Sequence, residues 1–229
     1  MLPRVAEAPL PSQHQAAQGE VSELSQSDNF DINSYSDRLL RLVQVVYAVV
    51  IGGSLIYFNE ILFPPHCTIE FGALFGVYLS AIMSWTGYHH RMGSFPYTPT
   101  KFGVFRLFVD IFIVIMYAYL LFAGSKQGQS IEPYLWGFSI VFFLWFISGL
   151  LRCIEHRDWG ASELKTLAIF FLCYTFLVPS LFKILISFTG ISTFLLNQVF
   201  VGFPLITMVI FRVTHDWCRL ERRMPQRKL

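Results

Sequence analysis

Two opposite charges lie inside an apolar stretch of the chain, where ionisable side chains are costly. Arg106 and Asp110 are four residues apart within residues 104–123, so on a helix they share one face, and Tyr117 falls on the same stripe. A charge at the centre of a membrane span costs about 2.5–3.5 kcal/mol on insertion scales. Two interpretations follow: Arg106 neutralises Asp110 as a structural clamp, or the pair lines a water-filled path or moves in gating.

A second polar group is expected near the other end of the same membrane domain. Lys183 follows Pro179 by about one helical turn, and Thr193, Asn197 and Gln198 occur in the next apolar stretch. If these side chains point at one another, they form a polar outer vestibule. Alternatively, Lys183 extends to the interface and the amides form hydrogen bonds between helices. A pore lined by Lys183 would favour anions, whereas one lined by Asp110 would favour cations.

Cysteine and histidine pairs raise the question of a metal site. Cys153 and His156 are three apart, as are His215 and Cys218, and these are ligand types that zinc uses. The two pairs are far apart in sequence and nothing in the sequence brings them together, so we expect neither a metal nor another cofactor. The chain also has no Gly-rich phosphate loop, GxSxG or HExxH motif, so we expect no enzymatic activity.

Small residues recur every four positions along the second apolar stretch, at Gly72, Gly76, Ser80 and Ser84. Such a stripe lets two helices approach closely in lipid, where no hydrophobic effect drives their association. It is compatible with packing inside one subunit or with a seam between subunits.

The elements that carry these residues are apolar stretches of about 20 residues, the length that crosses a bilayer core as a helix. Six are present, and we expect an all-α, polytopic transmembrane bundle over residues 34–213. The expected spans are 39–58, 69–88, 104–123, 133–154, 164–188 and 191–213. Pro179 and Pro204 lie inside the last two, and we expect the fifth span to be broken at Pro179.

Charge distribution predicts the orientation of these spans. Hydrophobic residues make up 54% of the chain and charged residues 14%, compared with about 25% charged in soluble domains. With six spans both termini share one side; fifteen of the 17 Lys and Arg fall on that side and two, Lys126 and Lys183, on the other. The positive-inside rule therefore predicts that both termini are cytoplasmic.

The two ends of the chain differ from the spans and from each other. Residues 1–33 carry one Arg and five acids and no periodic apolar pattern, which predicts a disordered acidic cytoplasmic tail. Residues 214–229 are basic and directly follow the last span, which predicts a cytoplasmic segment attracted to anionic lipid headgroups.

The region between residues 84 and 121 carries a resemblance. Its residues are Trp85, Gly87, Tyr88 and His89 at the end of the second span, Pro96, Tyr97 and Thr98 in the loop, and Arg106, Asp110 and Tyr117 in the third. This arrangement resembles that of small bacterial multi-pass proteins, some of which are similar to the membrane effectors of anti-phage systems. The resemblance implies a channel-like effector in a bacterial inner membrane, controlled by a nucleotide-sensing partner.

We therefore expect a homo-oligomeric channel or membrane-perturbing effector, gated from the cytoplasm by a nucleotide ligand or a protein partner. Pores are commonly assembled around a symmetry axis, and six short spans leave little soluble mass for other work. The alternatives are a membrane scaffold that anchors a soluble partner and a small-solute transporter. Transporters often carry two repeated halves with broken helices, and no clear internal repeat is present.

Overall fold

The computed structural model describes residues 13–65, 68–126, 130–156, 164–165, 167–188 and 191–223, with side chains described for those between 34 and 214. Every regular element in these ranges is a helix. The elements are α1 Gln13–Tyr57, α2 Asn59–Leu62, α3 Ile69–Met92, α4 Lys101–Gly124, α5 Glu132–Glu155, the π-helix η1 Ala168–Leu172, α7 Cys173–Phe188, α8 Thr193–Phe200 and α9 Phe203–Arg223.

Six helical segments are long and apolar enough to cross a membrane, which confirms the predicted all-α bundle of six spans. They are Ser34–Tyr57, Ile69–Met92, Lys101–Gly124, Glu132–Glu155, Ala168–Phe188 and Thr193–Thr214. Hydroxyl groups fix where three of the helices begin. The side chains of Thr68, Thr100 and Ser192 each accept a hydrogen bond from the backbone N–H three residues later.

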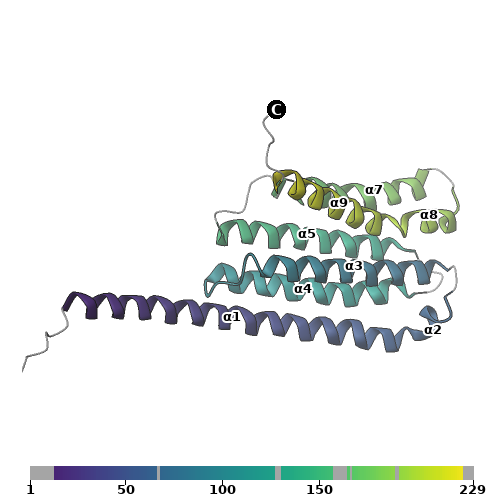
Figure 1. Ribbon diagram of the computed structural model, residues 1–229. Coiled ribbons are helices and arrows are strands. Elements are labelled where there is room, and N and C mark those ends of the chain that lie inside the picture. The colour runs from purple at the N-terminus through teal and green to yellow at the C-terminus, as the bar shows by residue number, and fades with distance from the viewer. Residues whose placement is uncertain are drawn as a thin grey trace, which may run out of the picture.

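The helices run alongside one another, and α4 lies in the interior of the bundle (Figure 1). It packs against α5, α1 and α3, while α7 covers α5 and α9 covers α3. The α3–α4 loop and the C-terminal ends of α5 and α9 lie at one end of the bundle, called here the Arg106 end. The helices α2 and α8 lie at the opposite end, called here the Lys183 end (Figure 1).

Three helix details differ from the expectations. The first helix begins at Gln13, ahead of the first span, so residues 13–33 are helical rather than irregular; no proline occurs between Pro11 and Pro64 to interrupt it. The fifth span is not broken at Pro179, which lies inside α7. The irregular part of this span is instead the π-helix η1, which lies directly before α7. The sixth span is divided into α8 and α9 just before Pro204.

The stripe of small residues on α3 faces into the protein. A side chain built at Gly76 would meet the Tyr134 hydroxyl of α5, and one at Gly72 would meet Val201. Ser80 and Ser84 are buried, and Ser84 lies 3.0 Å from the Tyr47 hydroxyl of α1. The stripe therefore serves close helix packing within one subunit, which leaves the seam between subunits without support.

This packing predicts that α3 cannot accept bulk at Gly76. A Cβ there would lie 3.0 Å from the Tyr134 Oη, so Gly76→Leu should overpack the contact between α3 and α5. We expect the unfolding free energy in detergent to fall by about 1–3 kcal/mol. Gly53→Leu on α1 is the matched control, because no atom lies within 4 Å of its Cβ position. Equal stability of the two variants would contradict the packing.

Candidate functional site

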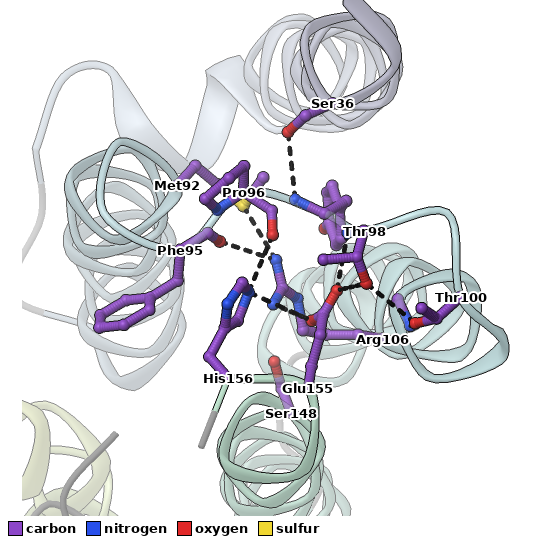
Figure 2. A network of polar contacts seen from close by, with 12 residues as sticks. Ser36, Met92, Phe95, Pro96, Thr98, Thr100, Arg106, Ser148, Glu155 and His156 are labelled. Carbon is purple, nitrogen blue, oxygen red and sulfur yellow. Dashed lines mark hydrogen bonds and ion pairs between the residues drawn. The ribbon is translucent and has the colours of Figure 1, made fainter. Parts of the chain in front are cut away.

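The Arg106 side chain is the centre of a polar network at the Arg106 end of the bundle (Figure 2). It is fully buried, and its guanidinium forms an ion pair with Glu155, the last residue of α5. The same group donates a hydrogen bond to the Phe95 carbonyl at 3.0 Å and lies 4.3 Å from the ring centroid of Tyr97. One charge thus joins α4, α5 and the α3–α4 loop.

The four-residue spacing predicted an ion pair between Arg106 and Asp110. This prediction is wrong, because Arg106 pairs with Glu155. Two physical reasons account for this. Helical side chains tilt toward the helix N-terminus, so Arg106 reaches toward the loop and not toward Asp110 one turn deeper. An arginine followed by an acid is also the weaker order for a pair at this spacing.

Asp110 is satisfied by hydroxyl groups. Its Oδ2 accepts a hydrogen bond from the Tyr97 hydroxyl and its Oδ1 accepts one from Ser148 of α5, each at 2.7 Å. Tyr88 lies 3.0 Å from the Tyr97 oxygen. Because Tyr97 has one hydroxyl proton and gives it to Asp110, Tyr88 must donate to Tyr97.

Glu155 holds the loop as well as Arg106. Its Oε1 accepts hydrogen bonds from the Thr98 backbone N–H at 2.7 Å and from the Thr98 hydroxyl at 2.6 Å. The next residue, His156, lies with its Nε2 3.1 Å from the Pro96 carbonyl oxygen (Figure 2). The carboxylate therefore makes the charge-assisted hydrogen bonds that are the stronger kind in proteins.

Tyr97 connects the two halves of the network. Its ring lies against the Arg106 guanidinium, its hydroxyl binds Asp110, and its backbone N–H donates to Ser36 of α1 at 3.1 Å. Burial, and then the negative charge of Asp110, raise the pKa of the Tyr97 phenol above its ordinary value of 10.0. The phenol thus remains a hydrogen-bond donor throughout the physiological range of pH.

A small cavity lies beside the network, between α1, α3, α4 and α5. Its volume is about 20 Å³, enough for one water molecule. Its polar lining comes from Tyr47, Ser84, Arg91, Asp110 and Arg152. Arg91 is further placed by a contact 5.1 Å from the centroid of Trp145.

Tyr117, the third residue of the predicted stripe, is buried deeper in the bundle. Its hydroxyl donates to the Ser80 carbonyl of α3 at 3.4 Å, so it belongs to helix packing. The stripe Arg106, Asp110 and Tyr117 thus faces the interior, as their shared spacing predicted.

The second predicted group consists of Lys183, Thr193, Asn197 and Gln198. Only part of it comes together, at the Lys183 end of the bundle. Thr193, Asn197 and Gln198 line one cavity of about 400 Å³ with residues from α3 and α4. Lys183 does not line it; its Nζ lies 3.9 Å from Glu132, and the side chain is 70% exposed. This agrees with the interpretation of Lys183 as an interfacial residue.

The candidate metal ligands are placed without forming a described site. Cys153 is half-buried, and His156 is engaged with Pro96. His215 and Cys218 lie on α9, and their side chains fall outside the described part of the chain. Among the residues whose side chains are described, no three His, Cys, Asp or Glu come together in a way that could hold a metal.

Sequence reasoning missed Glu155 and Ser148, and it named Tyr97 only among the residues that carry the resemblance, without a contact or a role. A signal for Glu155 was present, because an acid directly after an apolar span stands out on the side of the membrane predicted to be basic. Ser148 carried no such signal, since hydroxyls are common in spans. Comparison of the chain with models of protein families, with curated proteins and with solved structures finds no match.

The buried ion pair between Arg106 and Glu155 predicts that replacing Arg106 costs far more stability than replacing Lys183, whose ion pair is exposed. Arg106→Met should lower the unfolding free energy by about 3–5 kcal/mol, because it leaves Glu155 buried without its counter-charge. Adding Glu155→Met should restore part of that loss. The control is Lys183→Met, which breaks an exposed pair and should cost at most about 1 kcal/mol. Unfolding in mixed micelles measures all three, and similar losses for the two single variants would refute the buried pair.

The close packing of the α3–α4 loop against α4 predicts that Gly103 tolerates no side chain. A Cβ there would overlap the Thr98 carbonyl oxygen and lie 2.7 Å from the Glu155 Oε1. Gly103→Ala should therefore displace the loop and lower the thermal unfolding midpoint. Gly93→Ala, in the same loop, should leave that midpoint near wild type because its nearest contact is an ordinary 3.7 Å. A normal midpoint for Gly103→Ala would show that the loop does not sit against α4 in this way.

Proposed function

We propose that the protein is a homo-oligomeric transmembrane channel or membrane-perturbing effector that the buried network holds shut. The observation that carries this proposal is the convergence of four spans and one surface loop on a single set of charges. Arg106, Asp110 and Glu155 link α4 and α5 to the α3–α4 loop, and Tyr97 adds α1 through Ser36. Asp110 lies inside the third span, where an ionisable side chain is costly in lipid and usually functional.

The network has the properties expected of contacts that hold a channel in its closed state. The loop that it holds lies at the end of the bundle that the positive-inside rule assigns to the cytoplasm, where a ligand can reach it. A ligand that binds the loop better in a displaced position would shift the equilibrium toward spans that are no longer tied at this end. Packed helices have discrete arrangements, so a small loop movement can release a larger one.

The permeation path is proposed to form between copies. The cavity beside the network has room for about one water molecule, which is too little for a hydrated ion. The first and fifth spans bury the smallest shares of their apolar stretches, which leaves their outer faces for lipid or for further copies. Symmetric assembly is the usual route to a pore.

The trigger is proposed to be a nucleotide or a protein partner on the cytoplasmic side, as in the anti-phage effectors that residues 84–121 resemble. In that setting the acidic segment 1–33 and the basic segment 214–229 are the surfaces that the partner would contact. Their opposite charges favour contacts of different kinds, with the basic segment also suited to anionic lipid.

Single-channel recording tests this function. The full-length protein is purified, its oligomeric mass is measured in the same detergent, and it is inserted into planar bilayers. We expect a defined oligomer with rare openings, and an open-to-closed ratio raised about tenfold if Glu155→Gln weakens the closed state by about 1.4 kcal/mol. Glu132→Gln, which alters the exposed pair at the Lys183 end, is the control.

The other outcomes discriminate the alternatives. A monomer without current in wild type and Glu155→Gln would contradict the channel and favour a scaffold, whereas saturable uptake of a solute would favour a transporter. If a pore is found, an Asp110→Asn variant with altered cation selectivity would place Asp110 on the path. Unaltered selectivity would mean that Asp110 acts only in the buried network that holds the closed state.

A further inference from the structure

Three arginine side chains from different spans gather at the Arg106 end of the bundle, and the proposed gate uses none of them. They are Arg91 of α3, Arg152 of α5 and Arg212 of α9, each within about one helical turn of the end of its span. Arg91 and Arg152 line the same small cavity, and Arg152 is 5% exposed. The like charges of Arg91 and Arg106 act on Arg152, so positive charge is concentrated in this part of the protein.

Gly87 of α3 lets two of these guanidinium groups approach the same point. A Cβ atom built there would lie 2.8 Å from the Arg212 Nη1 and 3.4 Å from the Arg91 Nη2. A contact of 2.8 Å is too short for a real Cβ atom, so a larger residue at position 87 would displace Arg212. Two cations that approach one point repel each other, and an anion bound between them removes that repulsion.

Arg91 is held in place by contacts within the protein. Its Nε donates a hydrogen bond to the Gly87 carbonyl at 3.0 Å, and its guanidinium carbon lies 5.1 Å from the centroid of the Trp145 ring. A guanidinium has five N–H donors in a planar fork, so it can keep such contacts and bind a ligand at the same time. A side chain that is already positioned loses less entropy when the ligand binds.

Positive charge exceeds negative charge among the described side chains of this region. Asp110 lines the same cavity, but Tyr97 and Ser148 already donate hydrogen bonds to its two oxygens. Glu155 forms its ion pair with Arg106. The three remaining guanidinium groups therefore stand beside one carboxylate in the part of the chain that the structure describes, which favours an anionic ligand.

We propose that Arg91 and Arg212 bind a phosphate group at the surface of the bundle, and that the more deeply buried Arg152 adds to the positive potential there. Guanidinium forks match phosphate oxygens, and two forks can use separate oxygens of one tetrahedral group. A carboxylate has only two oxygens, which one guanidinium can occupy alone. The cavity has room for about one water molecule, so the phosphate lies outside it, against the half-buried Arg91 and Arg212.

Two sources of phosphate fit this position. The three arginines lie near the ends of their spans, at the depth of lipid headgroups, and basic pockets between spans on the cytoplasmic side bind phospholipid headgroups. Inorganic phosphate or a nucleotide carries the same group and reaches the same end from water. If the soluble source is correct, the site is where the proposed nucleotide trigger binds, and that assignment alone rests on the proposed function.

Thermal unfolding of the full-length protein in a non-ionic detergent tests the site. The lipid probe is phosphatidylglycerol, compared with phosphatidylcholine, whose phosphate is balanced by its own ammonium. The soluble probes are inorganic phosphate and ATP, compared with sodium chloride at equal ionic strength. A ligand that binds only the folded state raises the unfolding midpoint as its concentration increases. We expect at least one probe to raise the midpoint at concentrations where its comparison compound does not.

Variants connect that shift to the arginines. Arg91→Gln and Arg212→Gln should each weaken the apparent affinity by about tenfold or more, because each removes charge-assisted hydrogen bonds to the phosphate. Arg41→Gln, which removes an exposed arginine from α1, is the matched control for net charge and should bind as wild type does. Gly87→Ala keeps every charge but displaces the flexible end of Arg212, so it should weaken binding without a large loss of stability.

The outcomes separate the two sources and the refutation. Stabilisation by phosphatidylglycerol alone assigns the site to a lipid headgroup, and stabilisation by inorganic phosphate or ATP assigns it to a soluble ligand. The proposal is overturned if no probe exceeds its comparison compound, if Arg212→Gln binds as wild type does, or if Arg41→Gln weakens binding as much as Arg212→Gln. None of these results depends on ionic current, so the phosphate site and the gate fail or stand separately.

Discussion

The ion pair between Arg106 and Glu155 is the interaction on which the Arg106 end of the bundle depends, because neither charge is stable when buried alone. Both side chains are almost completely buried, at 0% and 1% exposure. Removing two charges from water costs more than their attraction returns unless further hydrogen bonds complete their shells. Here the loop supplies these bonds: the Phe95 carbonyl accepts from Arg106, and Thr98 donates twice to Glu155. The α3–α4 loop is therefore fixed by the electrostatic needs of the two spans beneath it, and the spans are held together by the loop.

Polar side chains have different surroundings at the two ends of the bundle. At the Arg106 end, carboxylates, hydroxyls and a guanidinium bind one another beside a cavity with room for a single water molecule, and the Arg106 Nε is left without a hydrogen bond to any described residue. At the Lys183 end, Glu70, Lys126 and Asn197 are among the residues that line a cavity of about 400 Å³. Between them lies an apolar interior in which aromatic rings such as Phe142, Phe171 and Phe211 stack or meet edge to face.

The spans were predictable because their signal is local: a stretch of about 20 apolar residues must cross the hydrocarbon as a helix, whatever its neighbours are. The caps at Thr68 and Thr100 are local in the same sense. The partners of Arg106 and Asp110 are not local. Glu155 is 49 residues from Arg106, and Ser148 is 38 residues from Asp110, so their pairing is decided by how α4 meets α5. Spacing along one helix could indicate a shared buried face, which was correct, but not which group across the interface would meet each charge.

Tyr97 shows why the two charges act as one unit although they do not pair. Its ring lies against Arg106, its hydroxyl donates to Asp110, and its backbone N–H donates to Ser36 on α1. A displacement of this one residue removes a contact from the guanidinium, a hydrogen bond from the carboxylate and the tie to α1 at the same time. The loop therefore cannot move by a small amount at small cost, since each of these groups would lose one of its buried contacts. Such an arrangement favours two discrete positions of the loop over a continuous range, which is the property on which the proposed gate relies.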